Sequence, residues 1–401
     1  MRVPSLGRAR SRGGDVATIE LFFDLVYVFA FSQLAAFFVE HLTGRGAIEM
    51  LVLFGGVWWV WNYTAWATNF VDPERTPVRI LLVVLMLLSL VMAAAIPEAF
   101  GDRGPQFAIT LAAIQVIRPL FIALTMRGQQ IGRNYAHLLA WSAAAAAIWV
   151  IGAFCEPDIR LIVWAVALAV DVAAPMLRTW LPGLGGIAMS EWKLTPAHLA
   201  ERNRLIFIIA LGETVLSIGR EFLHMESSVT TYVALCVAFL APVSYWWLYF
   251  AHHSERTEQR LEQSDDPTAL ARGGFAYAHA VLVAGVIVTA VGTEKMLAHP
   301  HEDATAVYAL LITGGPALYF AGLALFVASI GGLDRYECVV TAVMIASFAL
   351  VGTVATAIGL ELFATAGLTT ALLVAGVVAA AWHHRHDEAP GPSALTAASA
   401  V

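Results

Sequence analysis

The chain has 401 residues, of which 59% are hydrophobic and only 13% are charged, and its mean hydropathy is +0.73. Soluble globular domains carry about 25% charged residues, and a water-soluble protein of this size could not cover so much apolar surface. A net charge of −7 without any basic face argues against nucleic acid as a partner. The composition indicates an integral membrane protein whose main partner is the lipid bilayer.

Twelve apolar runs follow one another along the chain, each of about the 20 residues that a helix needs to cross a bilayer. They lie at 18–40, 47–70, 77–97, 105–126, 134–154, 159–178, 204–223, 229–251, 273–297, 304–329, 336–357 and 360–382. Short turn-like or charged segments separate most of them. The sequence therefore predicts an all-α, polytopic transmembrane helix bundle.

The distribution of basic residues predicts which side each loop occupies. With the N-terminus in the cytoplasm and the loops alternating, 17 of the 23 Lys and Arg residues are cytoplasmic and five are external. Cytoplasmic loops of membrane proteins carry such an excess of basic residues. We expect both termini to be cytoplasmic, with the helices in the plasma membrane.

Matched anchors at near-equal spacing indicate an internal repeat. Asp24 precedes the Trp58 pair by 34 residues, and Glu213 precedes the Trp246 pair by 33. Because each half has an even number of helices, the two repeats are parallel. The predicted organisation is given by five segments: a basic cytoplasmic N-terminus (1–17), a first six-helix repeat (18–178), a cytoplasmic linker (179–203), a second six-helix repeat (204–382) and a disordered cytoplasmic tail (383–401).

Five ionisable side chains fall inside the predicted spans: Asp24, Arg118, Asp171, Glu213 and His279. A charged side chain at the centre of a bilayer costs about 2.5–3.5 kcal/mol on insertion scales, so these groups must be paired, hydrated or neutralised. Polar residues on the same helix faces are expected to line a cavity beside them. These residues are Glu20, Tyr27, Gln33, Trp59, Asn62 and Ser217.

Two interpretations of these groups remain open. In the first, Asp24 and Glu213 are symmetry-related sites for a cation or proton, and Arg118, Asp171 and His279 are their neighbours. In the second, Asp24 and Arg118 form a buried ion pair that locks the first helix to the fourth. Asp171 and His279 also have a structural reading, as a packing partner and a hydrogen-bonded core histidine.

Four segments resemble the bacterial low temperature requirement protein A (LtrA) family. They are residues 20–34, which begin Glu-Leu-Phe-Phe-Asp, 204–215, which contain Leu-Gly-Glu, 277–279 and 314–319. Thr214 stands where the family pattern has Ser. A weaker resemblance, through Phe22, Phe23 and Asp24, is to endolysosomal-type potassium channels with a Phe-Ser-Asp motif. The LtrA resemblance implies a multi-pass bacterial membrane protein needed for growth at low temperature, and supplies no reaction or substrate.

The leading hypothesis is a transporter or channel for a small cation or protons. The alternative is a non-transporting membrane scaffold or folding factor needed in the cold. The sequence has no phosphate-binding glycine loop, nucleophile elbow or zinc-protease motif, so no enzyme activity, cofactor or metal site is expected. The oligomeric state stays open, a homo-oligomer included.

Overall fold

The computed structural model describes residues 6–8, 14–250, 260, 263–264 and 266–387, and within this part of the chain the secondary structure is helical. The long helices of the first half are α1 (Thr18–Glu40), α2 (Gly44–Phe70), α3 (Thr76–Ala94), α4 (Gly104–Thr125), α5 (Gln130–Ala153) and α6 (Pro157–Met176). Those of the second half are α7 (Pro196–Phe222), α8 (Val229–Phe250), α11 (His279–Ala298), α12 (Ala306–Ile330), α13 (Arg335–Ile358) and α14 (Leu362–Asp387). The short helix α10 (Pro267–Ala271) and a π-helical turn (Arg272–Ala278) lead directly into α11.

The prediction of an all-helical chain is confirmed, and two of its boundaries need correction. Helix α7 begins at Pro196, eight residues before the expected start at 204, because Pro is favoured in the first turn of a helix. Helix α14 continues to Asp387, so the disorder expected from residue 383 is wrong for the first five residues of that segment. The remainder of the expected tail and most of the basic segment 1–17 lie outside the described residues.

Ten of the described helical segments are long and apolar enough to cross a membrane. Each has 18 or more residues and an apolar stretch with at most two charged side chains, and α10 counts together with α11. The long helices α2 and α7 do not meet this criterion. They are the two helices that place most of the polar groups described below against α1.

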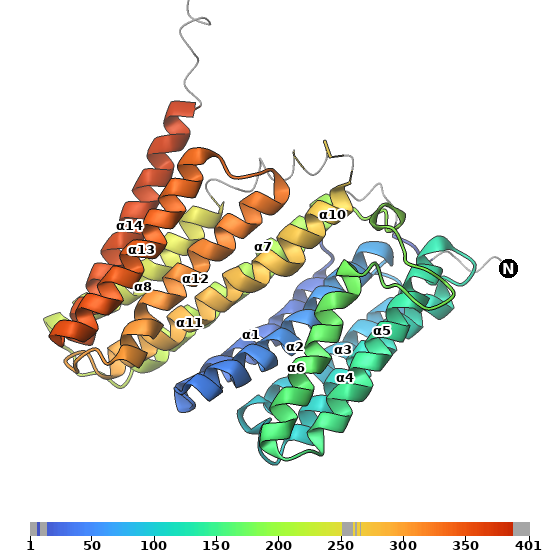
Figure 1. Cartoon of the computed structure of the whole chain (residues 1–401), viewed down its shortest axis with the longest axis horizontal. Coiled ribbons are helices and arrows are strands. Elements are labelled where there is room, and N and C mark those ends of the chain that lie inside the picture. The colour runs from blue at the N-terminus through green and yellow to red at the C-terminus, as the bar shows by residue number, and fades with distance from the viewer. Residues whose placement is uncertain (1–5, 9–13, 251–259, 261–262, 265, 388–401) are drawn as a thin grey trace, which may run out of the picture.

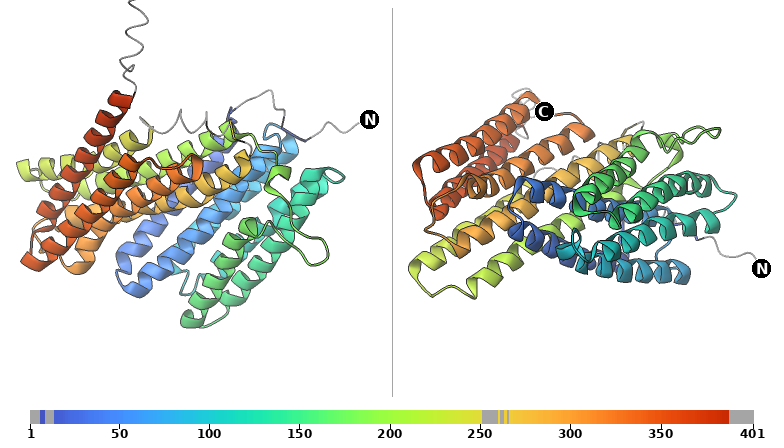
Figure 2. Two further views of the ribbon diagram at one scale, coloured as in Figure 1. Left: turned by 45° about the horizontal axis from the view of Figure 1, so that its top comes forward. Right: turned by 60° about the horizontal axis from the view of Figure 1, so that its bottom comes forward.

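The helices form two groups that meet at α1, α2, α7 and α11 (Figure 1). Helices α1 to α6 pack together on one side, and α8 and α12 to α14 lie on the other, which the two further views also show (Figure 2). Helix α7 contacts both α1 and α2, and α11 contacts α1. We call the contact between α1 and α7 the seam, because it joins the first half of the chain to the second.

Small residues allow α11 and α12 to pack closely in the second half. A Cβ atom added at Gly315 would lie 2.6 Å from the backbone nitrogen of Thr289, and one at Gly285 would lie 2.6 Å from the backbone nitrogen of Tyr319. Close helix contacts through small residues are a main source of association energy in a membrane, where burial of apolar surface between helices contributes little.

Replacing Gly315 with Ala is expected to lower the free energy of unfolding by about 1–3 kcal/mol, because its Cβ would overlap backbone atoms that cannot move aside cheaply. Gly314 is a matched control, since a Cβ there comes only within 3.4 Å of a Leu310 side-chain atom. Unfolding by sodium dodecyl sulfate in mixed micelles measures both variants. Equal stability of Gly315→Ala and Gly314→Ala would contradict the close packing.

Candidate functional site

Asp24 of α1 is held by a guanidinium from the other half of the chain. Arg202 of α7 donates from Nη2 to Asp24 Oδ1 over 2.6 Å and from Nε to Oδ2 over 3.1 Å. The indole Nε1 of Trp61 in α2 donates to the same Oδ1 over 2.8 Å. All three side chains are buried, so this is a two-point ion pair without exposure to solvent.

Glu20, one helical turn before Asp24, shares the same guanidinium. Arg202 Nη1 donates to Glu20 Oε1 over 2.9 Å and lies 3.1 Å from Thr68 Oγ1 of α2. Glu20 Oε2 accepts a hydrogen bond from the backbone N–H of Ala17, which caps the start of α1. Arg202 therefore ties α7 to both α1 and α2 through charged hydrogen bonds.

His198 completes this group, and both of its ring nitrogens have polar neighbours. The backbone N–H of Thr195 donates to Asn69 Oδ1 over 2.7 Å, which orients the Asn69 amide and places its Nδ2 3.1 Å from His198 Nδ1. Nε2 lies 2.9 Å from Glu20 Oε1 and 2.9 Å from Arg8 Nη1, so the ring links the carboxylate to a second guanidinium. We call Glu20, Asp24, His198, Arg202 and Thr68 the inner layer of the seam.

A second polar group crosses the seam further along both helices. Glu213 of α7 accepts hydrogen bonds from Ser32 Oγ of α1 and from Arg220 Nη2, the latter over 3.0 Å. Ser217, one turn after Glu213, donates to Glu294 Oε2 of α11 over 2.8 Å. We call these five residues the outer layer.

The two layers define the direction of the helices. Asp24 is opposite Arg202 and Ser32 is opposite Glu213, so residue numbers rise together along the seam. Helices α1 and α7 therefore run parallel. Asp24 and Ser32 are eight residues apart, which separates the layers by about 12 Å at a rise of about 1.5 Å per residue.

The structure does not form the expected ion pair between Asp24 and Arg118. Arg202 occupies both carboxylate oxygens of Asp24, and Arg118 lies in α4, inside the first half. Arg118 Nη1 donates to the Val60 carbonyl over 3.0 Å, and the guanidinium carbon lies 5.2 Å from the centre of the Tyr63 ring. Among the described residues, Nε and Nη2 of Arg118 have no hydrogen-bond partner, and no carboxylate lies within 4 Å.

Asp171 belongs to the same half as Arg118 and is bound by neutral donors. Its Oδ2 accepts from Gln115 Nε2 over 2.5 Å and from Trp149 Nε1 over 3.3 Å. Its backbone carbonyl accepts from Trp59 Nε1 over 2.8 Å. Trp59 thus helps to position α6 against α2, and Asp171 does not lie on the seam.

The remaining predicted residues are dispersed. His279 receives a hydrogen bond from Tyr249 OH at 2.7 Å on Nε2 and donates from Nδ1 to the Gly274 carbonyl at 2.8 Å. This geometry favours the structural reading of a hydrogen-bonded core histidine. Tyr27 is buried with its hydroxyl 3.3 Å from Ser89 Oγ, and Gln33 is half-buried.

The predicted set therefore divides among three places. Asp24, Glu213, Glu20 and Ser217 lie on the seam; Arg118, Asp171, Trp59 and Asn62 lie in the first half; His279 lies in the second. No single cavity unites them as the sequence suggested. Glu213 and Asp24 occupy different layers.

Sequence reasoning missed Arg202 and His198, which it placed in the linker 179–203. Their spacing to Glu213 could have indicated them. Arg202 and His198 precede Glu213 by eleven and fifteen residues, which is close to three and four helical turns. Both therefore continue the polar face that Glu213 and Ser217 begin. The apolar-run criterion removed them, since it started the helix after its charged first turns.

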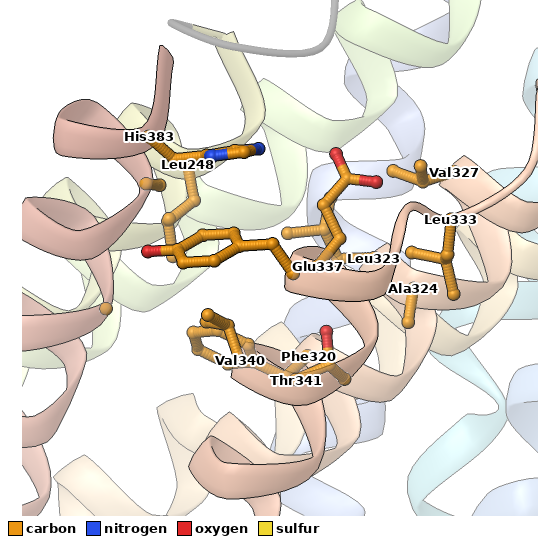
Figure 3. Close-up of a pocket in the computed structure, with 13 residues that line it drawn as sticks. Leu248, Phe320, Leu323, Ala324, Val327, Leu333, Glu337, Val340, Thr341 and His383 are labelled. Atoms are coloured by element: carbon orange, nitrogen blue, oxygen red, sulfur yellow. The ribbon is translucent and has the colours of Figure 1, made fainter. Parts of the chain in front are cut away.

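A cavity of about 60 Å³ lies in the second half, between α12, α13 and α14 (Figure 3). Its polar groups are partnered: Tyr336 OH donates to the Ala379 carbonyl, and Glu337 Oε2 accepts from the backbone N–H of Asp334. Figure 3 shows Glu337 and His383 at this cavity, among mostly apolar side chains such as Phe320. It contains none of the layer residues.

Comparison with known proteins identifies the family of this chain. The family described as bacterial low temperature requirement A protein (LtrA) has a model that matches residues 15–380, nearly the whole chain. This chain belongs to the LtrA family. It is therefore a multi-pass membrane protein of a bacterial family, and the match covers the seam and both of its layers.

A relative in Rhizobium meliloti (strain 1021), the uncharacterized protein RA0937, is 39% identical over 306 residues. The aligned region covers 76% of this chain and 75% of that protein. No solved structure matches the chain at a significant level. The LtrA assignment thus rests on sequence.

Proposed function

We propose that this LtrA-family protein moves a small cation or protons across the membrane by opening and closing the seam between its halves. The carrying observation is that buried charged groups join the halves at two depths, in the inner and outer layers. Buried ionisable groups in membrane proteins line the pathways of ions and protons, because they are too costly to be retained without partners or water.

The same proposal includes twelve membrane-spanning helices in two parallel repeats with cytoplasmic termini. Corresponding helices make corresponding contacts in the two halves. In the first half the contacting pairs are α1 with α2, α1 with α3, α3 with α4, α4 with α5, α5 with α6 and α2 with α6. In the second they are α7 with α8, α7 with α11, α11 with α12, α12 with α13, α13 with α14 and α8 with α14. The parallel course of α1 and α7 supports the same relation.

The charges of the seam favour a cation. Glu20, Asp24 and Glu213 are fully buried carboxylates. Among the described residues two buried guanidinium groups pair with them, Arg202 with Glu20 and Asp24, and Arg8 with Glu20 over 3.4 Å, so the carboxylates outnumber the buried cations. Arg220, which pairs with Glu213, is 52% exposed. A side chain so exposed can turn away into water, which leaves Glu213 and Ser32 to bind a cation in its place.

Transport by such a seam requires the two halves to move as bodies. Rocking of one repeat against the other around a central site is the usual route to alternating access in transporters built from repeats. In the structure both layers are closed, because Asp24 and Glu213 are buried and hydrogen-bonded. We assign the structure to a closed state in which the inner layer acts as a latch.

One observation favours the alternative, a scaffold without transport. Asp24 is satisfied by three hydrogen bonds from two side chains, which is what a permanent staple between the halves requires. In that reading the layers never open, and substitutions in them affect stability alone.

Flux measurements in liposomes distinguish the two functions. Wild-type protein is expected to conduct protons, K⁺ or Na⁺ above the background of empty liposomes, and Glu213→Gln is expected to lower that flux at least about tenfold, because it removes the charge that binds the cation. Glu40→Gln, at the exposed end of α1, is the matched control and keeps wild-type flux. Background flux for every protein with each of the three ions would remove the proposal and leave the scaffold.

A further inference from the structure

A short segment before α1 lies across the end of the seam. Residues 6–8, which we call the strap, pair with the segment that follows α2. The backbone N–H of Arg8 donates to the Phe70 carbonyl over 3.0 Å, and that of Asp72 donates to the Leu6 carbonyl over 2.8 Å. The Leu6 side chain is partly buried against the core. The strap is therefore anchored to the first half of the chain.

Arg8 inserts its side chain into the inner layer, where only 6% of that side chain is exposed. Its Nη1 donates to the Thr68 carbonyl over 3.0 Å and lies 3.4 Å from Glu20 Oε2 and 2.9 Å from His198 Nε2. Its Nη2 donates to the backbone carbonyl of Asp15. The guanidinium thus contacts both halves of the chain, because Glu20 and Thr68 belong to the first half and His198 belongs to the second.

The oxygen atoms around Arg8 favour a positive charge. Arg202 donates to Oε1 of Glu20, while Oε2 faces Arg8 and the backbone N–H of Ala17. The Thr68 carbonyl is one of the last four of α2, and such carbonyls have no partner within their own helix. The end of a helix where these carbonyls lie favours a cation. Arg8 supplies that cation from within the chain.

The strap is held less tightly than Arg202. Arg202 is fully buried and donates to Asp24 over 2.6 Å and 3.1 Å, whereas Arg8 lies 3.4 Å from Glu20 Oε2. Arg202 is also fixed within the 27 residues of α7, while the strap has no helix and is anchored by the backbone hydrogen bonds given above. Release of the strap therefore costs less free energy than release of Arg202, so the strap is the part of this end that leaves first.

We propose that the strap is an autoinhibitory contact, in which Arg8 keeps the inner layer closed to the cytoplasm until the strap leaves. Arg8 contacts the carbonyl of Thr68, and Arg202 contacts the hydroxyl of the same residue, so the strap lies directly over the latch. This inference rests on the proposed function, because it names the contact that regulates the opening of the seam.

The first test measures access to the inner layer and needs no ion flux. A membrane-impermeant maleimide labels Thr68→Cys in inside-out vesicles without a cation gradient, after the three native cysteines are replaced with Ser. Adding Arg8→Gln is expected to speed labelling at least about tenfold, because the charge that holds the strap is gone. Arg8→Lys keeps a charge and is expected to keep the slow labelling. Arg79→Gln, at an exposed arginine in the first turn of α3, is the matched control with unchanged labelling.

The second test locks the strap in place with a disulfide. Gly7 and Val71 form an antiparallel pair flanked by the two backbone hydrogen bonds of the strap, and opposite Cα atoms at such a position lie about 4.5 Å apart. A disulfide joins Cα atoms about 4.4–6.8 Å apart. A Cβ at Gly7 would come only within 3.6 Å of Met126 Cε, which is an ordinary contact.

Oxidation of Gly7→Cys/Val71→Cys, without the native cysteines, is expected to lower the ion flux in liposomes at least about tenfold, because the closed state is then favoured. Reduction is expected to restore the flux. A merely structural role of the strap predicts no such loss, since the lock keeps every contact of Arg8. Gly7→Cys alone is the control, and its flux is expected to be the same in oxidising and reducing buffer.

The two readouts separate the strap from transport. Faster labelling of Arg8→Gln in protein that shows no flux would support the strap and contradict transport. Unchanged labelling of Arg8→Gln would overturn the strap, and the flux of the wild type then decides the proposed function by itself. Should Arg8→Gln fail to fold, the disulfide decides, because it keeps Arg8. Equal flux above background in the oxidised and reduced double-cysteine protein would overturn the strap as well.

Discussion

Replacing Arg202 with Met is expected to lower the free energy of unfolding by about 3–5 kcal/mol, because removal of one partner leaves buried charges uncompensated. Asp24 would lose its guanidinium, and Glu20 would keep only the longer contact of 3.4 Å with Arg8. Neither is exposed to water that could replace the lost hydrogen bonds. Unfolding by sodium dodecyl sulfate in mixed micelles measures the change.

A companion experiment neutralises Glu20 and Asp24, the two acids that lose Arg202 in Arg202→Met. Adding Glu20→Gln and Asp24→Asn to Arg202→Met is expected to recover more than half of the lost stability, since both carboxylates that lose Arg202 are then neutral and only Arg8 lacks its former partner Glu20. Non-additivity of this size distinguishes an ion-pair network from a loss of packing. If the triple variant is less stable than Arg202→Met, the network does not hold the halves together.

Replacing Arg118 with Met is expected to have the opposite outcome, although Arg118 is as deeply buried as Arg202. Two of its nitrogens have no partner among the described residues, and its bonds go to a carbonyl and to the Thr64 hydroxyl. Burial of a charge without compensation is unfavourable, so the substitution is expected to leave the free energy of unfolding unchanged or to raise it by up to about 2 kcal/mol.

The comparison of the two arginines controls for size and burial. A loss of more than about 3 kcal/mol in Arg118→Met, the magnitude expected for breaking a buried pair, would show that Arg118 has a carboxylate partner after all. That result would support the second interpretation from the sequence, an ion pair of Asp24 with Arg118.

Hydropathy alone predicted the helices, because lipid requires each span to be apolar over a fixed length. With the π-helical turn from Arg272 counted as the start of α11, eleven of the twelve starts lie within four residues of the predicted ones, and the exception is α7. Its first turns carry His198 and Arg202, which are polar because they meet Glu20 and Asp24 inside the protein. An apolar-run criterion treats such a buried polar turn as a loop.

The partners of the buried charges could not be predicted from the sequence. The cost of a charge in lipid correctly indicated that Asp24 and Glu213 face the protein interior, and both are buried. Spacing along one helix does not say which other helix lies opposite. Arg118 is the cation that the predicted spans offer to Asp24, because the apolar-run criterion leaves Arg202 in the linker 179–203.

The most direct test of the account is whether the inner layer opens. Thr68 contacts Arg202 and is buried, so Cys at this position is inaccessible in the closed state. The native Cys155, Cys236 and Cys338 are first replaced with Ser, since none of them is in a disulfide. In inside-out vesicles, which expose the cytoplasmic face, a membrane-impermeant maleimide is expected to label Thr68→Cys under a cation gradient at least about tenfold faster than without one, a population shift of about 1.4 kcal/mol. Equal, negligible labelling in both conditions, with ion flux intact, would contradict an opening seam.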